Sequence, residues 1–119
     1  MGDGWETRRR RDKGFDWLIL NSIKGEKIDK IEISTHHFKG NYPSHCSLQA
    51  AYITGRRSSL AIVKSSNKWK FLMNKINLSA NKTHVFRNKL MKKNKINFIK
   101  INIFPDGGIS RFKIFGKSI

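Results

Sequence analysis

The 119 residues are enough for one domain with a modest hydrophobic core and too few for two. Hydrophobic residues make up 38% of the chain, which excludes simple disorder. Apolar runs stay well short of the roughly 18–20 residues of a membrane helix, and residues 1–11 are too polar for a secretory signal. The single cysteine, Cys46, excludes an internal disulfide framework and a cysteine-based zinc site. We therefore expect a single domain spanning residues 1–119, soluble, intracellular and working in the cytoplasm.

The charge of the chain is strongly unbalanced. The 25 Lys and Arg against eight Asp and Glu give +17 and a pI near 10.5, which is typical of nucleic-acid-binding proteins. However, Lys (17), Ile (15) and Asn (10) also have A/T-rich codons, so genome composition could produce the same excess. Basic residues are dense only in Arg8–Arg11 and in 89–95, and the other lysines fall mostly where strands would face solvent. Nucleic-acid binding is therefore the less favoured alternative.

Alternation with a period of two dominates the chain and predicts β-strands. The strands predicted in the first half cover residues 15–20, 28–35, 47–53 and 59–64, and a short apolar stretch follows at 69–73. Turn signals lie at 24–26 and 55–57, and the Gly, Asn and Pro of 38–43 predict an ordered loop. Segment 87–95 could be a short basic helix or a strand with a loop, because its period does not decide between them.

The last part of the chain carries the strongest pattern. Isoleucines alternate with polar residues over 99–103, and Phe112 and Ile114 alternate with basic residues further on. Between them, Pro105–Gly108 predicts a turn, since both glycines accept a positive φ. The pattern therefore predicts a β-hairpin. With seven or so short strands in total, it indicates an all-β protein, an antiparallel β-sandwich or jelly roll.

Familiar catalytic motifs such as a phosphate loop, a nucleophile elbow or a zinc-binding helix are absent. Four histidines are present: His36, His37, His45 and His84. Neighbouring residues on a strand point to opposite faces, so His36 and His37 are not expected to bind one metal together. For each histidine the ordinary interpretation, a surface or hydrogen-bonded side chain, is favoured.

Three polar segments carry more functional groups than structure requires. Segment 2–11 combines two acids, Trp5 and four arginines, whose planar guanidinium groups match a carboxylate or a ureido oxygen. Segment 35–43 offers His, Lys and Asn where a strand turns into a loop, and 105–111 offers Asp, Ser and Arg at the predicted turn. Structural explanations stay open for all three: Trp5 can fill the core, and Asn41 and Asp106 can serve their turns.

These three segments, in this order, resemble the second, C-terminal repeat of the allantoicase family. The matching stretches are MGDGWETRRRR at 1–11, DW at 16–17, THHFKGNYPSHCSLQAA at 35–51, LSANKTHVF at 78–86 and INIFPDGGISRFKIFGK at 101–117. The resemblance implies a β-sandwich of the jelly-roll, galactose-binding-domain-like kind. It also implies hydrolysis of allantoate to ureidoglycolate and urea, a step in the breakdown of allantoin and purines.

The resemblance points to site positions, and the chemistry of the substrate suggests their roles. Allantoate is a carboxylate whose central carbon bears two ureido groups, and expelling urea requires an acid for the leaving nitrogen and a base for water. The expected residues are Arg9, Arg10 and Arg111 for the anion, Lys39 and Asn41 for the ureido groups, and Asp3, Glu6, His37 and Asp106 for proton transfer. We expect no cofactor, although His and carboxylate ligands leave a divalent metal open.

The chain also departs from the family pattern. Ser34 stands where family members generally carry an acid, which could remove a proton-transfer group, a metal ligand or a hydrogen bond. Asn74 and Asn77 replace a usual proline and lysine. Family members contain two repeats and this chain holds one, so we expect a homo-oligomer or pairing with a second repeat. The alternative is a catalytically inactive sandwich that binds a small ligand or a partner.

Overall fold

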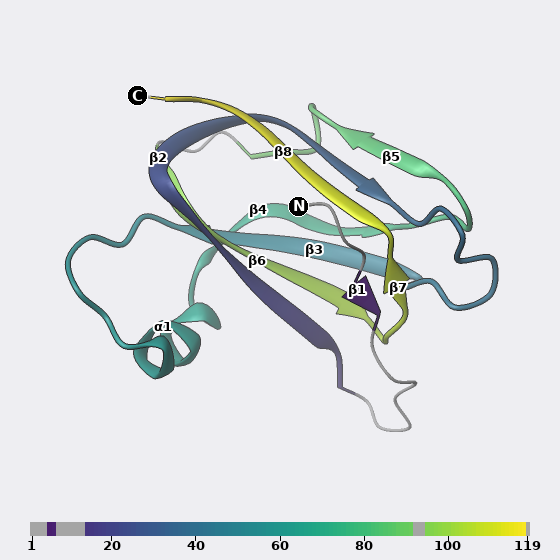
Figure 1. Cartoon of the computed structure of the whole chain (residues 1–119), viewed down its shortest axis with the longest axis horizontal. Coiled ribbons are helices and arrows are strands. Elements are labelled where there is room, and N and C mark those ends of the chain that lie inside the picture. Colours follow the sequence, from purple (N-terminus) through teal and green to yellow (C-terminus); the bar gives the residue numbers. More distant parts are fainter. Residues whose placement is uncertain (1–4, 7–13, 92–94, 119) are drawn as a thin grey trace.

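Eight strands and one helix form the part of the chain that the computed structural model describes, residues 5–6, 14–91 and 95–118 (Figure 1). In chain order the elements are β1 (Trp5–Glu6), β2 (Asp16–Ser34), β3 (His45–Ala51), α1 (Ser59–Ser66), β4 (Lys70–Asn77), β5 (Thr83–Phe86), β6 (Ile96–Phe104), β7 (Gly108–Ile109) and β8 (Arg111–Ser118). Every strand pairing is antiparallel. Within these residues, no helix is long and apolar enough to cross a membrane.

Strand β2 belongs to two layers of the molecule. Its first half pairs with β6, and its second half pairs with β5 and β8. Figure 1 shows the strand curving from one layer to the other, and its register shifts between Asn21 and Glu26. The predicted turn at 24–26 is therefore wrong, because the irregularity is absorbed inside an extended strand as a bulge would be.

The hydrophobic core lies between the two layers, β4-β3-β6-β2 and β5-β2-β8. Ile33 of β2, Leu48 of β3, Ile101 of β6 and Phe112 of β8 are at most 2% exposed and belong to one cluster. The isoleucines of 99–103 lie on the same face of β6, as their alternation predicts. The structure therefore confirms an all-β antiparallel sandwich.

The predicted hairpin is wrong although its strands and turn exist. β6 and β8 do not pair with each other: β6 pairs with the first half of β2, and β8 pairs with its second half. The short strand β7, which lies between β6 and β8 in the sequence, pairs with β1. The chain therefore crosses from one layer to the other after the turn, where a hairpin would fold back.

The predicted strand over 59–64 is also wrong, because this segment forms α1. The side chain of Ser58 accepts a hydrogen bond from the backbone N–H of Ala61 at 3.1 Å and caps the helix. This capping outweighs the strand preference of the β-branched residues that follow. Residues 87–91 form neither a helix nor a strand, and 92–94 lie outside the described residues.

Two side chains on the outer face of the β3–β6 layer differ from expectation. Lys100 is buried although lysines were expected to face solvent, and its ammonium donates to Ser66 Oγ at 2.9 Å. Trp17 is 41% exposed although it lies in a run of strand-forming hydrophobic residues, and the Nζ of Lys100 lies 5.0 Å from the centre of its ring. Trp69 is buried, and the side chain of Trp5 lies outside the described residues.

The thiol of Cys46 lies in the centre of the core. It is completely buried, and this burial raises its pKa from 9.0 to about 12, because the thiolate cannot be solvated there. The unfolded thiol loses its proton near pH 9.0, whereas the folded one keeps its proton up to about pH 12. The stability that this group contributes is thus complete below pH 9 and is lost as the pH rises through that window.

We expect this titration to lower the free energy of unfolding by about 2 kcal/mol between pH 8 and pH 10.5, since each pKa unit is worth about 1.4 kcal/mol. Guanidinium unfolding at both pH values measures the change. Cys46→Ala is the control, because it lacks the thiol and should show a smaller decline by that amount. Equal declines in the two proteins would contradict the raised pKa.

Candidate functional site

The three polar segments, which are far apart in the sequence, meet at one end of the sandwich. Strand β1 pairs with β7, which brings Glu6 opposite Gly108 (Figure 1). The backbone N–H of Gly108 donates to the carbonyl of Asn41 at 2.9 Å and joins the turn 105–108 to the loop 38–43. The backbones of the three segments therefore form one continuous assembly.

Two glycines allow this close contact between backbones. Gly107 has φ +130°, and a Cβ atom there would lie 2.6 Å from the carbonyl carbon of Tyr42. A Cβ atom on Gly108 would overlap the ring of Phe38. The predicted turn is thus confirmed, and a positive φ is found at Gly107, whereas Gly108 is needed because of the neighbouring ring.

A polar pocket of about 400 Å³ adjoins this assembly. Its lining residues are Glu32, Ser34, His36, His37, Thr83, Ser110, Arg111 and Lys113. The strand pairing explains how they meet: Ser34 of β2 is opposite both Thr83 of β5 and Arg111 of β8. They lie on the outer face of the β5-β2-β8 layer, since Ile31 and Ile33 of β2 point into the core.

The lining of the pocket contains both hydroxyl groups and charged groups. Ser34 Oγ and Thr83 Oγ1 share a hydrogen bond of 2.9 Å, and Ser110 Oγ donates to the carbonyl of Ser34 at 3.1 Å. Arg111 and Lys113 supply two cations to the lining, against one carboxylate, Glu32. Apart from the histidines, these charged side chains give the lining a net positive charge, which suits an anionic ligand.

One wall of the pocket is the turn that follows β2, and His37 lies in it with an unusual backbone. Its φ is +73°, in the left-handed region that L residues other than Asn, Asp and His rarely adopt. The side chain of Asn81 holds it there, because Asn81 Oδ1 accepts the backbone N–H of His37 at 3.0 Å. Thr35 Oγ1 adds a hydrogen bond to the carbonyl of Ser79 at 2.6 Å.

This geometry corrects the expectation for the paired histidines. His36 and His37 lie in a turn, so strand geometry does not place them on opposite faces. Both line the same pocket, and their ring centres are 6.4 Å apart. Even so, no group of three or more His, Cys, Asp or Glu that could hold a metal ion is found across 5–6, 14–91 and 95–118.

The structure places the other predicted site residues in different ways. Lys39 and Asn41 are exposed on the loop 38–43, and Asp106 is half-buried on the turn that contacts it. These three adjoin the pocket without lining it. Only the backbone of Glu6 is described, and the predicted residues Asp3, Arg9 and Arg10 lie outside the described residues.

Three residues that line the pocket were not predicted as site residues: Glu32, Thr83 and Lys113. Alternation along β2 puts Glu32 and Ser34 on one polar face, and this signal was available. Thr83 and Lys113 reach the pocket only because β5 and β8 pair with β2, and no local sequence pattern predicts that pairing.

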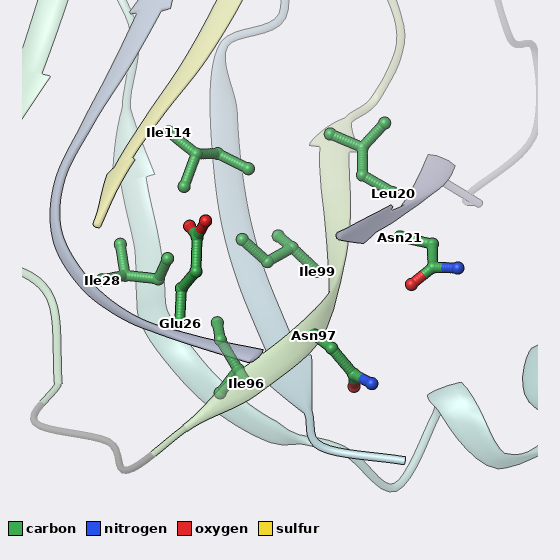
Figure 2. A pocket seen from close by; sticks show the side chains of 8 residues that line it. All are labelled: Leu20, Asn21, Glu26, Ile28, Ile96, Asn97, Ile99 and Ile114. Carbon is green, nitrogen blue, oxygen red and sulfur yellow. The ribbon is translucent and has the colours of Figure 1, made fainter. Parts of the chain in front are cut away.

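A second cavity, of about 130 Å³, lies at the bend of β2 and is mainly aliphatic (Figure 2). Ile28, Ile99 and Ile114 line it, and Figure 2 shows the carboxylate of Glu26 among them. Its other polar side chains are the amides of Asn21 and Asn97, and the amide of Asn97 is already bonded to the backbone of Ile53, so this cavity offers a polar substrate fewer hydrogen-bonding groups than the polar pocket does. The polar pocket is therefore the candidate functional site.

Comparisons with known proteins agree with this geometry. Residues 1–119 match the family model for the allantoicase repeat. A probable allantoicase from Acinetobacter baumannii (strain AYE) is 45% identical over 117 residues, which are 98% of this chain and 34% of that protein. A probable allantoicase from Acinetobacter baylyi is 44% identical over 119 residues, which are 100% of this chain and 35% of that protein.

Solved structures show the same fold. The crystal structure of allantoicase from Saccharomyces cerevisiae matches 96% of this chain and 31% of its own with a TM-score of 0.77 and 28% identity. A second allantoicase structure matches 95% of this chain and 31% of its own with a TM-score of 0.75. The fold is therefore a jelly-roll β-sandwich, and the chain spans about a third of the length of the relatives that it matches. By the match of its family model over residues 1–119, this chain belongs to the allantoicase repeat family.

Proposed function

We propose that this chain is one repeat of an allantoicase and that it takes part in the hydrolysis of allantoate to ureidoglycolate and urea. The observation that carries the proposal is the meeting of three polar segments beside a positively charged pocket. In the reaction, the bond between the central carbon and one ureido nitrogen breaks. Water adds a hydroxyl group to that carbon, and the leaving nitrogen takes a proton to give urea.

The residues divide these tasks by their chemistry. Arg111 pairs with the substrate carboxylate, because a guanidinium group donates two parallel hydrogen bonds to a carboxylate. His37, on the wall of the same pocket, transfers the proton, since an imidazole ring can both accept and donate one. Lys39 and Asn41 contact the ureido groups from the adjoining loop.

The N-terminal segment and the 105–108 turn complete the site in this proposal. Glu6 and Asp106 are further proton-transfer groups, and the β1–β7 pairing places Glu6 opposite Gly108, two residues after Asp106. Asp3, Arg9 and Arg10 belong to the same segment as Glu6, and we assign them to proton transfer and to the anion by chemistry alone.

A second repeat completes the enzyme. The relatives are about three times as long as this chain, so we propose that it acts as a homo-oligomer or together with another allantoicase repeat. The lone, buried Cys46 leaves no disulfide to form, which supports the cytoplasm as its compartment. The proposed steps use side chains alone, and assays with EDTA and with added Mn²⁺ test whether a metal contributes.

Replacing Arg111 with alanine is expected to lower kcat/KM for urea release from allantoate about 100-fold, since a charge-assisted pair is worth roughly 2–3 kcal/mol. Arg56→Ala is the matched control, because Arg56 is equally exposed but lies in the segment between β3 and α1. The assay uses the purified chain, alone and mixed with the other repeat of the Acinetobacter baumannii relative.

Equal activity of Arg111→Ala and the unaltered chain would contradict the role of Arg111. A folded chain that releases no urea in either mixture would contradict the proposed hydrolysis. If such a chain still bound a ligand, it would be the non-catalytic sandwich that Ser34 and the single repeat also suggest.

A further inference from the structure

The carboxylate of Glu32 is held in place inside the polar pocket. It lies on the outer face of β2, where its side chain is 23% exposed and lies 3.4 Å from the ammonium of Lys30. Across the sheet, Glu32 is opposite Lys113 of β8. The ion pair with Lys30 thus holds this carboxylate, and Lys113 on the neighbouring strand adds a second cation to the same face of the sheet.

Glu32 is also the strongest hydrogen-bond acceptor among the described residues that line the pocket. The hydroxyls of Ser34 and Thr83 bond to each other, and Ser110 is bonded to the backbone. The hydroxyl oxygens and the histidine rings there can also accept, but Glu32 is the one carboxylate among these lining residues. A ligand with several N–H donors therefore has one carboxylate to which it can donate.

The pocket offers complementary groups to the two ends of a small molecule. Arg111 lies on β8 one same-face step from Lys113, and Lys113 is opposite Glu32, so Arg111 and Glu32 are diagonal neighbours whose backbones are about 7–8 Å apart. A small carboxylate ligand paired with Arg111 would therefore have its other end near Glu32. A ureido group presents two N–H bonds on the same side, which match the two oxygens of a carboxylate in a paired geometry.

We infer that Glu32 recognises a ureido group, by accepting two of its N–H bonds, in ligands whose carboxylate pairs with Arg111. The ligand class is the small N-carbamoyl acids, to which allantoate belongs. The inference rests on the proposed function and adds to it a substrate-recognition residue that the three polar segments do not contain.

The test compares two stable probes. N-carbamoylglycine has a carboxylate and a complete ureido group, whereas N-acetylglycine lacks the terminal NH₂. We expect the unaltered chain to bind N-carbamoylglycine more tightly, as measured by NMR titration. Glu32→Gln is expected to weaken the binding of N-carbamoylglycine about tenfold or more, since hydrogen bonds to a charged group are the strong ones, and to leave N-acetylglycine unchanged.

Two further variants separate recognition from damage to the fold. Glu32→Asp keeps the charge and should restore part of the preference. Glu26→Gln is the matched control, because Glu26 lies on the same strand but lines the separate aliphatic cavity of Figure 2, and it should bind like the unaltered chain. With allantoate and the second repeat present, Glu32→Gln should raise KM more than it lowers kcat.

The outcomes distinguish a failure of ureido recognition by Glu32 from a failure of the proposed hydrolysis. Equal weakening of both probes by Glu32→Gln, or no weakening, would overturn ureido recognition, while urea release by the unaltered chain would leave the hydrolase proposal intact. Failure of both probes to bind would also overturn the inference. Only the absence of urea release in the presence of a second repeat would overturn the hydrolase as well.

Discussion

A glycine in place of His37 is expected to abolish urea release and, at the same time, to stabilise the fold. Removing a positioned proton-transfer group lowers a rate by roughly 10²–10⁴-fold. The backbone of His37 has φ +73°, which costs an L side chain about 1–2 kcal/mol and costs glycine nothing. Part of this gain is lost to the greater freedom of glycine in the unfolded chain, so a net stabilisation of about 1 kcal/mol or less is expected.

Urea assays and guanidinium unfolding of the same preparation measure both effects. His37→Asn is the matched variant, because asparagine tolerates this backbone conformation but lacks the imidazole. It should be as stable as the parent chain and as inactive as the glycine variant. Full activity in either variant would remove His37 from the mechanism, and a marked loss of stability on introducing glycine would show that the turn is not strained.

The expected trade between activity and stability follows from how the turn is held. Asn81 accepts the backbone N–H of His37, and Thr35 fastens the same turn to the carbonyl of Ser79. These contacts maintain a left-handed backbone conformation that costs an L residue free energy. Unfavourable backbone conformations that the surrounding structure enforces cluster at functional sites. Asn81 therefore acts as a positioning residue for the imidazole in the proposed mechanism.

The sequence predicts where most strands lie but not how they pair. Alternation locates the strand that contains Ile99 and Ile101 and the strand around Phe112, because burial of one face imposes a period of two. It cannot show that both pair with β2, since that choice depends on contacts distant in sequence. The segment 59–64 is misjudged for a different reason: a single capping residue, Ser58, outweighs the β-branched residues.

For the candidate site, too, some residues can be predicted from the sequence and others depend on how the strands pair. Its three polar segments are visible in the sequence, because their side chains exceed what turns and strands require. Their meeting through the β1–β7 pairing and the contact of Gly108 with Asn41 is a property of the topology. The carboxylate of the pocket, Glu32, lies outside all three segments; alternation puts it on the polar face of β2, but only strand pairing shows that Arg111 and Lys113 share its pocket.

Replacing Gly107 with alanine is expected to give the largest loss of stability. Its φ of +130° is essentially restricted to glycine, and an added Cβ would lie 2.6 Å from the carbonyl carbon of Tyr42. Because the obstacle is backbone, it cannot rotate away. The strained conformation and the displaced loop together are expected to cost about 3 kcal/mol or more.

Gly40→Ala is the matched control, because Gly40 lies in the contacting loop and a Cβ there would meet nothing within 4 Å. Its free energy of unfolding should stay within about 0.5 kcal/mol of the parent chain. Guanidinium unfolding of the three proteins gives the comparison. Similar stabilities for the two variants would mean that the turn can move away from Tyr42 without cost.

The same variant tests whether the fold and the site depend on one contact. Gly107 lies beside Gly108, whose N–H joins the turn to Asn41 and whose strand pairs with Glu6. If this junction assembles the site, Gly107→Ala should lose urea release even at temperatures where it remains folded, because the turn and the loop no longer meet. A folded Gly107→Ala protein with full activity would show instead that the pocket around Arg111 works without the junction.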